Sequence, residues 1–348
     1  MTWAEQARAR HRSTRGAPVY RGGMTTPLSP ERRHPSVSTF TAPPSGDGTC
    51  LVIHGGAGGR LSELALGGPT SDGGSDAGSA WADGLRAAHE AGERVLRAGG
   101  SALDAVCASV AALEDDPLFN AGRGAALTAS GRAELDASVM TGEGGAGAVA
   151  AVRTVRHPVL LARAVMERTD HVLLAAPDES LADAWGLERV DPAFFVTPAR
   201  ERQLADVLAR RAEASRHGTV GAVAIDTTGR IAAATSTGGM VGQADGRVGD
   251  SPLIGAGTFA RDGIAGVSCT GMGEAFIRGA VAHEVCARIV HAGATLRAAV
   301  EGTIAAELVA RGAEGGIIAA GAGGIVAAHN SPAMFAAFRD GEELVVLT

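Results

Sequence analysis

The strongest constraint on the fold is the alternation of strand pairs with helix pairs in the second half of the sequence. Two apolar runs, 219–226 and 230–236, are joined by Thr227-Thr-Gly229 and predict a β-hairpin. The segments that follow alternate in the same way: strands 253–258 with 263–269 and 316–319 with 324–328, and helices at about 273–291 and 294–311. Strand pairs separated by helix pairs favour two sheets covered by helices over a doubly wound parallel sheet.

The first half of the sequence predicts the same mixture of short strands and helices. Order begins at the apolar strand Cys50-Leu-Val-Ile53, which ends in the glycine-rich segment His54-Gly-Gly-Ala-Gly-Gly59. The further elements are a helix over 81–98, a helix over Ser101–Leu113 with Ser101 as its N-cap, strands over 133–140 and 147–153, and a helix over Pro158–Arg168. A mobile loop is expected at 67–79, where Gly, Ser and Asp cluster, and an exposed, partly helical linker at 198–217.

Residues 1–49 differ from the rest of the chain in charge and composition. They contain seven arginines against Glu5, Glu31 and Asp47, are rich in Ser, Thr and Pro, and show no sustained hydrophobic period. This composition predicts a disordered N-terminal extension. An Arg-rich, Ser-rich start is also typical of organelle-targeting peptides, and a dispensable tail or a start codon assigned too early is the alternative.

Composition excludes several classes of chemistry and partner. All 31 basic residues among the 348 are arginine, so no lysine can form a Schiff base or complete a phosphate loop. The net charge of −7 gives no basic surface suited to nucleic acid. No apolar run reaches the length of a membrane span, and the first residues lack the apolar core of a secretory signal.

Most familiar catalytic motifs are absent or misplaced. The pattern Gly142-x-Gly144-x-x-Gly147 matches the dinucleotide fingerprint, but with 50 glycines it is expected by chance, and it precedes a strand instead of opening a helix. His283-Glu284 has no second histidine one turn on, so a zinc-hydrolase helix is disfavoured. The cysteines form no C-x-x-C pair and predict reduced thiols in the cytoplasm, and Cys269 is interpreted as a buried structural thiol.

Thr219 is the remaining candidate nucleophile. It lies where the charged segment 198–217 meets an apolar strand. If the bond after Gly218 were cut, Thr219 would carry a hydroxyl and a free α-amine, whose ordinary pKa is about 8. That amine could act as general base for its own hydroxyl, so lysine would not be needed. On the junction alone, an ordinary strand start remains the alternative.

Longer motifs on both sides of this junction share their order and spacing with one family. They are Thr219-Val-Gly-Ala-Val-Ala-Ile-Asp226, Ala234-Thr-Ser-Thr-Gly-Gly239, Gly246-Arg-Val-Gly-Asp-Ser-Pro252, Gly255-Ala-Gly257, Ser268-Cys-Thr-Gly-Met-Gly-Glu274, His54-Gly-Gly-Ala-Gly58, Leu113-Glu-Asp-Asp-Pro-Leu-Phe-Asn-Ala-Gly122 and Glu134-Leu-Asp-Ala-Ser138. Through these motifs, residues 50–348 resemble the plant-type asparaginase/isoaspartyl peptidase family of N-terminal-nucleophile hydrolases.

The resemblance implies an α+β fold, a four-layer αββα sandwich that is made as an inactive precursor. Self-cleavage between Gly218 and Thr219 would yield an α chain, with residues 50–218 of the domain, and a β chain, 219–348. The two chains would stay associated, and two αβ units would form a dimer, (αβ)2.

The resemblance also implies catalytic roles. In the cleaved enzyme Thr219 would be the nucleophile, and Thr237 would hydrogen-bond its hydroxyl and orient it. Thr270 and the backbone N–H of Gly271 would form the oxyanion hole. Asn120 matches a supporting asparagine near the cleavage site, with a turn-forming role as the alternative.

Substrate recognition is implied for a second group of residues. The guanidinium of Arg247 matches the α-carboxylate of an aspartyl substrate, and Asp250 would accept from the α-ammonium. The other implied substrate contacts are Thr270, Gly271 and Gly273. Met272 stands where a small or polar residue is expected, which would alter the lining of the pocket.

The implied reaction needs no cofactor, but the family implies one structural ion. The segment 113–123 corresponds to a sodium-binding loop, with candidate positions Leu113, Glu114, Asp116, Phe119, Ala121 and Arg123. Ligation there is mostly by backbone carbonyls, which suit a hard cation, so side-chain changes need not abolish it. Arg123 departs from the family pattern because it puts a positive side chain on a cation-binding loop.

Together these motifs predict a cytoplasmic hydrolase that cleaves L-asparagine and β-aspartyl (isoaspartyl) dipeptides through a β-aspartyl ester of Thr219. Its partners would be small-molecule substrates, with no nucleic acid and no membrane. Two alternatives stay open: a glycosylasparaginase, which removes the sugar from Asn-linked glycans, and an uncleaved, non-catalytic binding protein. Gly238, where the glycosylasparaginase branch favours asparagine, counts against the first, and the intact site residues count against the second.

Overall fold

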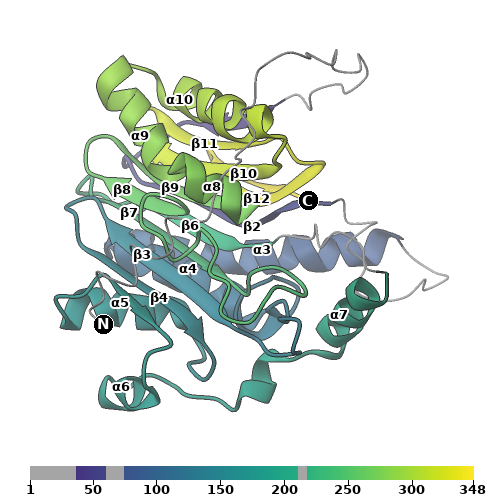
Figure 1. Cartoon of the computed structure of the whole chain (residues 1–348). Helices are drawn as coiled ribbons and strands as arrows, with labels where there is room; N and C mark the ends of the chain where they lie inside the picture. The colour runs from purple at the N-terminus through teal and green to yellow at the C-terminus, as the bar shows by residue number, and fades with distance from the viewer. Residues whose placement is uncertain (1–36, 60–73, 211–217) are drawn as a thin grey trace, which may run out of the picture. The chain divides into compact units, whose positions relative to one another are not determined.

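Two β-sheets stacked face to face form the centre of the structure (Figure 1). The computed structural model describes residues 37–59, 74–210 and 218–348. The larger sheet has eight strands in the order β13 (Glu343–Leu347), β12 (Ala333–Asp340), β2 (Cys50–Gly58), β6 (Val220–Ile225), β7 (Ile231–Thr237), β3 (Leu135–Thr141), β4 (Ala146–Val152) and β5 (Leu173–Ala175). The smaller sheet has five, in the order β1 (Ser38–Ala42), β11 (Gly324–His329), β10 (Gly315–Gly321), β9 (Ala265–Gly271) and β8 (Thr258–Arg261). Neighbouring strands in these sheets are antiparallel, except that β4 and β5 are parallel.

Side chains that alternate along β6 show how the layers are held together. Val223 points into the core that the two sheets share, where Val267 of β9 is also buried. Its neighbours Ala222 and Ala224 belong instead to the core on the outer face of the larger sheet. Because successive strand side chains point to opposite faces, a strand buried on both faces is apolar throughout. This explains the unbroken apolar run that starts the second half of the sequence.

Helices cover the outer faces of both sheets (Figure 1). The larger sheet carries α3 (Gly74–Arg97), α4 (Ala102–Asp115) and α5 (Pro158–Arg168), and the smaller one carries α8 (Gly273–Gly279), α9 (Val281–Ala292) and α10 (Leu296–Thr303). The remaining elements are α6 (Glu179–Ala184), α7 (Pro198–Arg210), three 3₁₀ turns at Gly122–Gly124, Pro192–Phe195 and Val309–Arg311, and a π-helical turn at Ile304–Leu308. The layers are therefore helix, sheet, sheet and helix, which confirms the prediction of two sheets covered by helices. Within the described ranges, no helix has both the length and the apolar character needed to cross a membrane.

Two local predictions are confirmed at the ends of elements. Ser101 is the N-cap of α4, and its Oγ accepts from the backbone N–H of Asp104 at 3.1 Å. The hairpin between β6 and β7 turns at Thr227-Thr-Gly229, where Gly229 has a φ of 78°. Asp226 stabilises this turn because its Oδ1 accepts from the backbone N–H of Thr228 at 2.9 Å.

Strand β1 corrects the expected extent of the N-terminal extension. It lies within 1–49, which we expected to be disordered, yet it pairs antiparallel with β11 from Ser38 to Ala42. Its sequence has no apolar run of its own, so its order comes from backbone hydrogen bonds to the edge of the smaller sheet. Residues 1–36 lie outside the described residues.

The prediction of an exposed, partly helical linker over 198–217 is confirmed for the helix, but it missed a buried face. Residues 198–210 form α7, and Arg200, Gln203 and Leu204 on this helix are buried. Leu204 packs in a cluster that includes Val241 from the loop after β7. Helical spacing places these residues on one face, which the count of charges alone does not reveal. Residues 211–217 lie outside the described residues.

Other boundaries differ from the predictions by part of an element. Residues 74–79 begin α3 instead of forming a loop, while the rest of the predicted loop, 67–73, lies outside the described residues. The helix expected over 273–291 is broken at Ala280, whose left-handed φ of 43° ends α8 and starts α9. The helix expected over 294–311 is α-helical only to Thr303 and continues as π and 3₁₀ turns. The strand expected over 253–258 begins only at Thr258, because turns occupy the preceding residues.

Candidate active site

The candidate nucleophile lies at one end of the larger sheet, where β6 begins and β7 ends. The antiparallel register pairs Val220 with Ser236, which brings Thr219 beside Thr237. The Thr219 hydroxyl donates to Oγ1 of Thr237 at 3.1 Å, and both side chains are buried. The hairpin therefore makes the hydrogen bond that the family resemblance implied for this pair.

The carbonyl of Gly218, in the peptide bond before Thr219, accepts two hydrogen bonds. The side-chain Nδ2 of Asn120 donates to it at 2.5 Å, and the Thr237 hydroxyl donates to it at 3.2 Å. The Thr237 oxygen in turn accepts from the backbone N–H of Gly239 at 3.0 Å. Two donors aimed at one carbonyl oxygen, next to a hydroxyl, can stabilise negative charge that develops on that oxygen.

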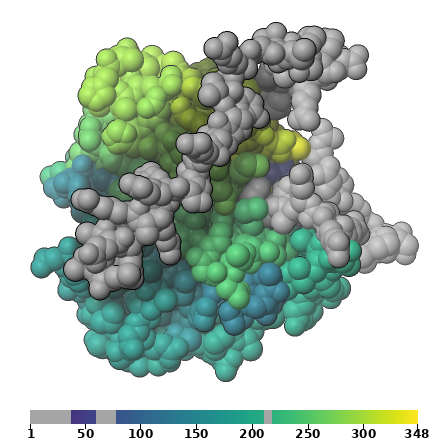
Figure 2. Space-filling model, viewed as in Figure 1, coloured from purple at the N-terminus to yellow at the C-terminus, as the bar shows by residue number. Residues whose placement is uncertain are grey.

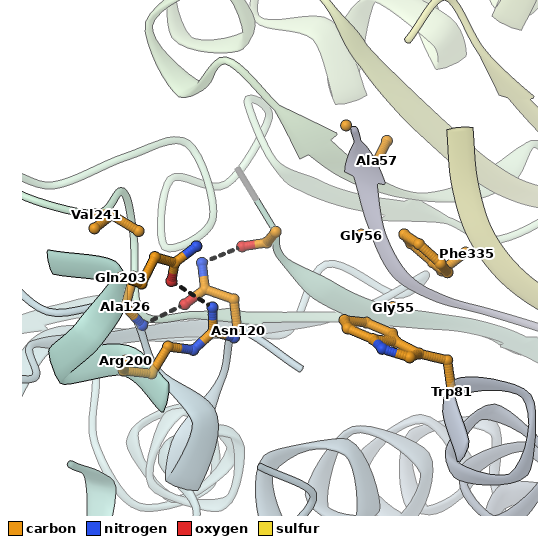
Figure 3. Close-up of a pocket in the computed structure, with 12 residues that line it drawn as sticks. Gly55, Gly56, Ala57, Trp81, Asn120, Ala126, Arg200, Gln203, Val241 and Phe335 are labelled. Carbon is orange, nitrogen blue, oxygen red and sulfur yellow. Dashed lines mark hydrogen bonds between the residues drawn. The ribbon is translucent and has the colours of Figure 1, made fainter. Parts of the chain in front are cut away.

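Asn120 is held on both ends of its side-chain amide (Figure 3). Oδ1 accepts from the backbone N–H of Ala126 at 2.6 Å, which assigns the donor end of the amide to the other side. Nδ2 donates to the carbonyl of Gly239 at 2.7 Å as well as to Gly218. The backbone carbonyl of Asn120 accepts from Gly238 N–H at 3.1 Å. Asn120 therefore ties the turn after α4 to a junction that lies 98 residues further along the chain.

A pocket opens onto this junction (Figure 3). One wall is the glycine-rich end of β2, where Gly56 has a φ of 123° and a Cβ would lie 3.2 Å from Cα of Gly218. Glycine is needed here because the φ is left-handed and the two backbones approach closely. The other residues that line the pocket are Gly55, Ala57, Gly58, Trp81, Asn120, Ala126, Arg200, Gln203, Val241 and Phe335.

Arg247 and Asp250 lie in the loop between β7 and β8. Green atoms from this part of the chain are visible on the face shown in Figure 2. The guanidinium of Arg247 donates from Nε and Nη2 to Oε1 of Glu274 at 3.1 and 3.0 Å, and from Nη1 to Oε1 of Gln243 at 3.3 Å. Its side chain is 17% exposed, so the charged group is accessible at its edge. Arg247 thus presents a fixed, planar donor group near the surface.

Asp250 is a buried carboxyl with one unsatisfied oxygen. Among the described residues, its Oδ2 has no hydrogen-bond partner. Burial raises the pKa of Asp250 to about 7, and the charges of Glu274 and Asp136 add to the rise while that of Arg247 opposes it. Burial also raises the pKa of Asp136 to about 7. A buried carboxyl oxygen without a donor is costly, so this position suits a ligand that brings a donor of its own.

Thr270, Gly271 and Gly273 lie where β9 ends and α8 begins. The Thr270 hydroxyl accepts from the backbone N–H of Ala57 at 3.2 Å, which sets it against the strand that walls the pocket. Gly271 has a φ of 142°, a value that favours glycine. A Cβ on Gly273 would lie 2.8 Å from Nη2 of Arg247 and 2.9 Å from Oδ1 of Asp250. The structure therefore brings the expected recognition residues, Arg247 and Asp250, together beside Gly273. It brings Thr219, Thr237 and Asn120 together around the Gly218 carbonyl.

Comparison with known proteins assigns the chain to a family. A family model described as asparaginase matches residues 47–347. The chain belongs to the asparaginase family. An isoaspartyl peptidase of Salmonella typhimurium is 48% identical over 266 residues, which cover 72% of this chain and 84% of that protein. An isoaspartyl peptidase of Escherichia coli is 48% identical over 248 residues (68% and 77%), and an isoaspartyl peptidase/L-asparaginase of Homo sapiens is 41% identical over 235 residues (66% and 72%).

The loop 113–123, predicted from the sequence to bind sodium, folds back on the end of α4. Gly122 and Gly124 each lie against backbone carbonyls of this turn: a Cβ on Gly122 would overlap the carbonyl of Glu114, and a Cβ on Gly124 would overlap that of Phe119. A carbonyl of Pro117 would lie 2.6 Å from the same added atom on Gly124. Backbone oxygens gathered in this way suit a hard cation.

Charged side chains of that loop point to other partners. Glu114 is buried and accepts from the Ser236 hydroxyl at 2.6 Å and from Val159 N–H at 3.0 Å. The guanidinium of Arg123 lies 5.6 Å from the centre of the Phe194 ring. Of the predicted positions, Leu113, Phe119 and Ala121 are buried and apolar, and Asp116 caps the end of α4. Within the described residues, no group of three His, Cys, Asp or Glu could hold a metal.

A buried chain of hydroxyls, which the sequence analysis did not identify, runs between the two sheets of this asparaginase-family fold. It begins at His54, whose Nε2 lies 3.0 Å from Oγ of Ser268, and burial lowers the pKa of this imidazole to about 3. The chain continues from Ser268 to Thr235 at 2.7 Å, Thr258 at 2.5 Å, Ser138 at 2.8 Å and the carbonyl of Ser251 at 2.6 Å. This chain of hydroxyls could have been predicted from the polar residues that stand at buried positions of otherwise apolar strands.

Proposed function

We propose that the chain is an autoproteolytic threonine hydrolase that cleaves L-asparagine and β-aspartyl dipeptides through an ester of Thr219. The observation that carries the proposal is the Gly218 carbonyl, which accepts from Asn120 at 2.5 Å and from Thr237 at 3.2 Å beside the Thr219 hydroxyl. A carbonyl in an ordinary strand needs no side-chain donors of this kind. Such donors are useful where the carbonyl carbon is attacked.

Self-cleavage would convert one peptide bond into an ester and then into two chain ends. Oγ1 of Thr219 attacks the carbonyl carbon of Gly218, and the resulting oxyanion is stabilised by Asn120 and Thr237. The C–N bond breaks, the proton lost by the hydroxyl passes to the leaving nitrogen, and the α-amine of Thr219 is free. Water then hydrolyses the ester, giving a carboxylate on Gly218 and the restored hydroxyl of Thr219.

The cleaved enzyme would repeat this chemistry on its substrate. The α-amine of Thr219 takes the proton of its own hydroxyl, and Oγ1 attacks the β-carbonyl carbon of the aspartyl group. The Thr270 hydroxyl and the Gly271 N–H would stabilise the oxyanion. The C–N bond breaks, the leaving nitrogen takes the proton and departs as ammonia or as the amine of an amino acid, and water hydrolyses the β-aspartyl ester to release aspartate.

Recognition of the substrate head group would use the second group of residues. Arg247 would exchange a bond to Glu274 for the α-carboxylate, since its fork of N–H donors matches a carboxylate. The α-ammonium would donate to Oδ2 of Asp250, the buried oxygen that lacks a partner among the described residues. Gly273 would leave the room that both ends of the substrate need.

The printed names of the relatives support the substrate class. Two bacterial relatives are named isoaspartyl peptidase, and the human one is named isoaspartyl peptidase/L-asparaginase. A glycosylasparaginase is not favoured by these names. Gly238 also counts against a glycosylasparaginase, which favours asparagine at this position. A Cβ on Gly238 would lie 2.5 Å from Cβ of Ala125, so an asparagine side chain would not fit here.

Three further properties are part of the proposal. A sodium ion would be held by backbone carbonyls of the loop 113–123, where it would stabilise the turn that carries Asn120; the backbone carbonyls beside Gly122 and Gly124 support this. Two αβ units would form an (αβ)2 dimer, as the family resemblance implies. A cytoplasmic location is supported by four free, buried cysteines.

Gel electrophoresis under denaturing conditions tests the proposal. The purified chain should split into two fragments, and the smaller one should begin Thr-Val-Gly-Ala when its N-terminus is sequenced. It should then release ammonia from L-asparagine and a free amino acid from a β-aspartyl dipeptide. Thr219→Ala should leave one intact, inactive chain, and Asn120→Ala should slow the splitting about 100-fold because one oxyanion donor is lost. A wild-type chain that stays intact and inactive after long incubation would contradict the proposal, and activity on glycosylated asparagine alone would favour the alternative.

A further inference from the structure

Arg200 is a buried guanidinium in α7, the helix that precedes the junction at Gly218. Only 7% of the residue is exposed, and it lines the same pocket as Asn120 (Figure 3). Its Nε donates to the carbonyl of Gly124 at 2.6 Å, Nη2 to the carbonyl of Leu118 at 3.3 Å, and Nη1 to Oε1 of Gln203 at 2.9 Å. No carboxylate of the described residues forms an ion pair with it.

Burial of this charge without an opposite charge is energetically costly. Transfer of a charged group from water to the interior is unfavourable unless the group is paired or fully hydrogen-bonded. Burial lowers the pKa of Arg200 to about 10, so the guanidinium still carries its proton at neutral pH. The neutral oxygens of two backbone carbonyls and one amide are all that compensate it in the described residues. A methionine, which is similar in length and has no charge, would fill much of this space at a lower cost. We therefore expect the guanidinium donors to have a specific role.

The two carbonyls that Arg200 binds lie on either side of Asn120 in the same turn. Leu118 comes two residues before Asn120, and Gly124 comes four residues after it. The guanidinium is planar and its N–H groups point in fixed directions, so a single arginine can hold both carbonyls at a set separation. Asn120 itself bonds Ala126 through Oδ1 and the Gly218 carbonyl through Nδ2. The turn, the Asn120 amide and the Arg200 guanidinium are thus one hydrogen-bonded unit.

We propose that Arg200 is a positioning residue for self-cleavage: its guanidinium clamps the turn from Leu118 to Gly124 so that the Asn120 amide faces the Gly218 carbonyl. The inference rests on the proposed self-cleavage and extends it to a residue that does not touch the reacting atoms. It also gives α7 a function. Leu204 packs in the core beside Val241 and so fixes the helix. Arg200, on the same helix, then holds the turn in place through its hydrogen bond to the Gly124 carbonyl.

Loss of the clamp should slow self-cleavage without preventing folding. Arg200→Met keeps the length of the side chain and removes every donor, so the rate constant of splitting should fall about 10- to 100-fold, the effect of small displacements of a group that stabilises charge. Arg200→Lys should give an intermediate rate, because one ammonium cannot hold both carbonyls in the geometry of a guanidinium. Arg168→Met, at an exposed position on α5, is the matched control and should split at the wild-type rate. Splitting of Arg200→Met at the wild-type rate would overturn the proposal.

A double-mutant cycle separates positioning from a general loss of stability. If Arg200 acts through Asn120, then Arg200→Met should not slow splitting further in a chain that already carries Asn120→Ala. If the two substitutions multiply in their effects, Arg200 does not act through Asn120 and the proposal is wrong.

Hydrogen exchange tests the clamp independently of self-cleavage. In an uncleavable Thr219→Ala precursor, Arg200→Met should speed the exchange of the Ala126 and Gly238 amides at least about tenfold, because both bond Asn120. The amide of Val267, in the middle of β9, should exchange at an unchanged rate. Unchanged protection at Ala126 and Gly238 would overturn the clamp. A wild-type chain that fails to split would instead contradict the proposed function, and the exchange result would still decide whether Arg200 holds the turn.

Discussion

Single residues in this molecule show that its two candidate subsites differ in electrostatics. Around Gly218 the side-chain donors of Asn120 and Thr237 all have acceptors. Around Asp250 a buried carboxyl oxygen has no donor in the described part of the chain, and its pKa is raised to about 7. Buried groups with a shifted pKa and an unused hydrogen-bonding atom cluster at functional sites, because a bound ligand can supply the missing hydrogen bond. The contrast is what the proposed function requires, with a cleavage junction that is complete in the precursor and a recognition site that binds its substrate later.

Asp250→Asn should stabilise the fold at high pH and weaken substrate binding. The pKa of Asp250 is raised from 3.8 to about 7, so the folded chain binds this proton more tightly than the unfolded chain does. The contribution of Asp250 to stability therefore falls as the pH rises from about 4 to about 7, and an amide escapes this loss because it never ionises. We expect the variant to gain stability over wild type at pH 8 but not at pH 4, when urea unfolding is measured in the uncleavable Thr219→Ala background.

The same substitution has a second readout in the cleaved enzyme. Without the carboxylate, the KM for L-asparagine should rise at least about tenfold at pH 8, since a hydrogen bond to a charged group is lost. A stability difference that is the same at pH 4 and pH 8 would show that the pKa of Asp250 is no higher in the folded chain than in the unfolded one.

At the scale of elements, β6 is shaped by what lies between the sheets as much as by its own propensity. A Cβ on Gly221 would overlap Oγ of Ser268 and would lie 2.5 Å from Nε2 of His54. The hydrogen bond between those two side chains crosses from β2 to β9, so the strand can pass only where it has no side chain. The glycine two residues after Thr219 is therefore required by the hydroxyl chain, and β6 in turn sets the position of Thr219.

Gly221→Ala should destabilise the fold and slow self-cleavage. The added methyl group must displace a buried polar contact, and overpacking of this kind costs about 1–3 kcal/mol. Urea unfolding of the uncleavable precursor measures the loss, and gel electrophoresis measures the splitting rate in the chain that carries Thr219. Gly46→Ala is the control, because an added Cβ there would have no neighbour within 4 Å. Equal stability of the two variants would show that the space around Gly221 is larger than the contacts indicate.

At the scale of the whole domain, the proposed cut divides the sequence but not the sheets. Strands from before and after Gly218 alternate, so four strand pairs cross the division: β1 with β11, β12 with β2, β2 with β6, and β7 with β3. The helices from before the cut cover strands from after it: α4 packs on β6 and β7, and α3 packs on β12 and β13. Each fragment alone would expose apolar faces and unpaired strand edges.

The two fragments should therefore remain one particle after complete self-cleavage. On size-exclusion chromatography in buffer they should elute together, because separation would break four ladders of backbone hydrogen bonds and open a shared core. Urea or heat should release both at once in a single cooperative transition. Separate elution of the fragments in buffer would contradict the interleaved sheets.

Much of the architecture follows from patterns within short segments. Apolar runs bounded by turn residues predicted β6, β7, β10 and β11, and helical spacing with a cap at Ser101 predicted α4. Such patterns record which face of a local element is buried, which is a property of neighbouring residues. Strand β1 was not predicted, because its order depends on pairing with the edge of β11, far away in the sequence, and not on its own composition.

For the site, the sequence and its family resemblance were enough to single out Thr219 as the candidate nucleophile, since its junction and the motifs around it are continuous stretches of residues. The resemblance placed Asn120 near the cleavage site, but only the tertiary structure shows that its Nδ2 donates to the Gly218 carbonyl, 98 residues away. The hydrogen bond from Arg200 to the Gly124 carbonyl, across 76 residues, had no counterpart in the sequence analysis. The hydroxyl chain from His54 to Ser251 likewise joins strands from both sheets. A local sequence pattern predicts whether a side chain is buried. Which partner that side chain contacts depends on how the two sheets stack, and the stacking depends on every element that packs into the core.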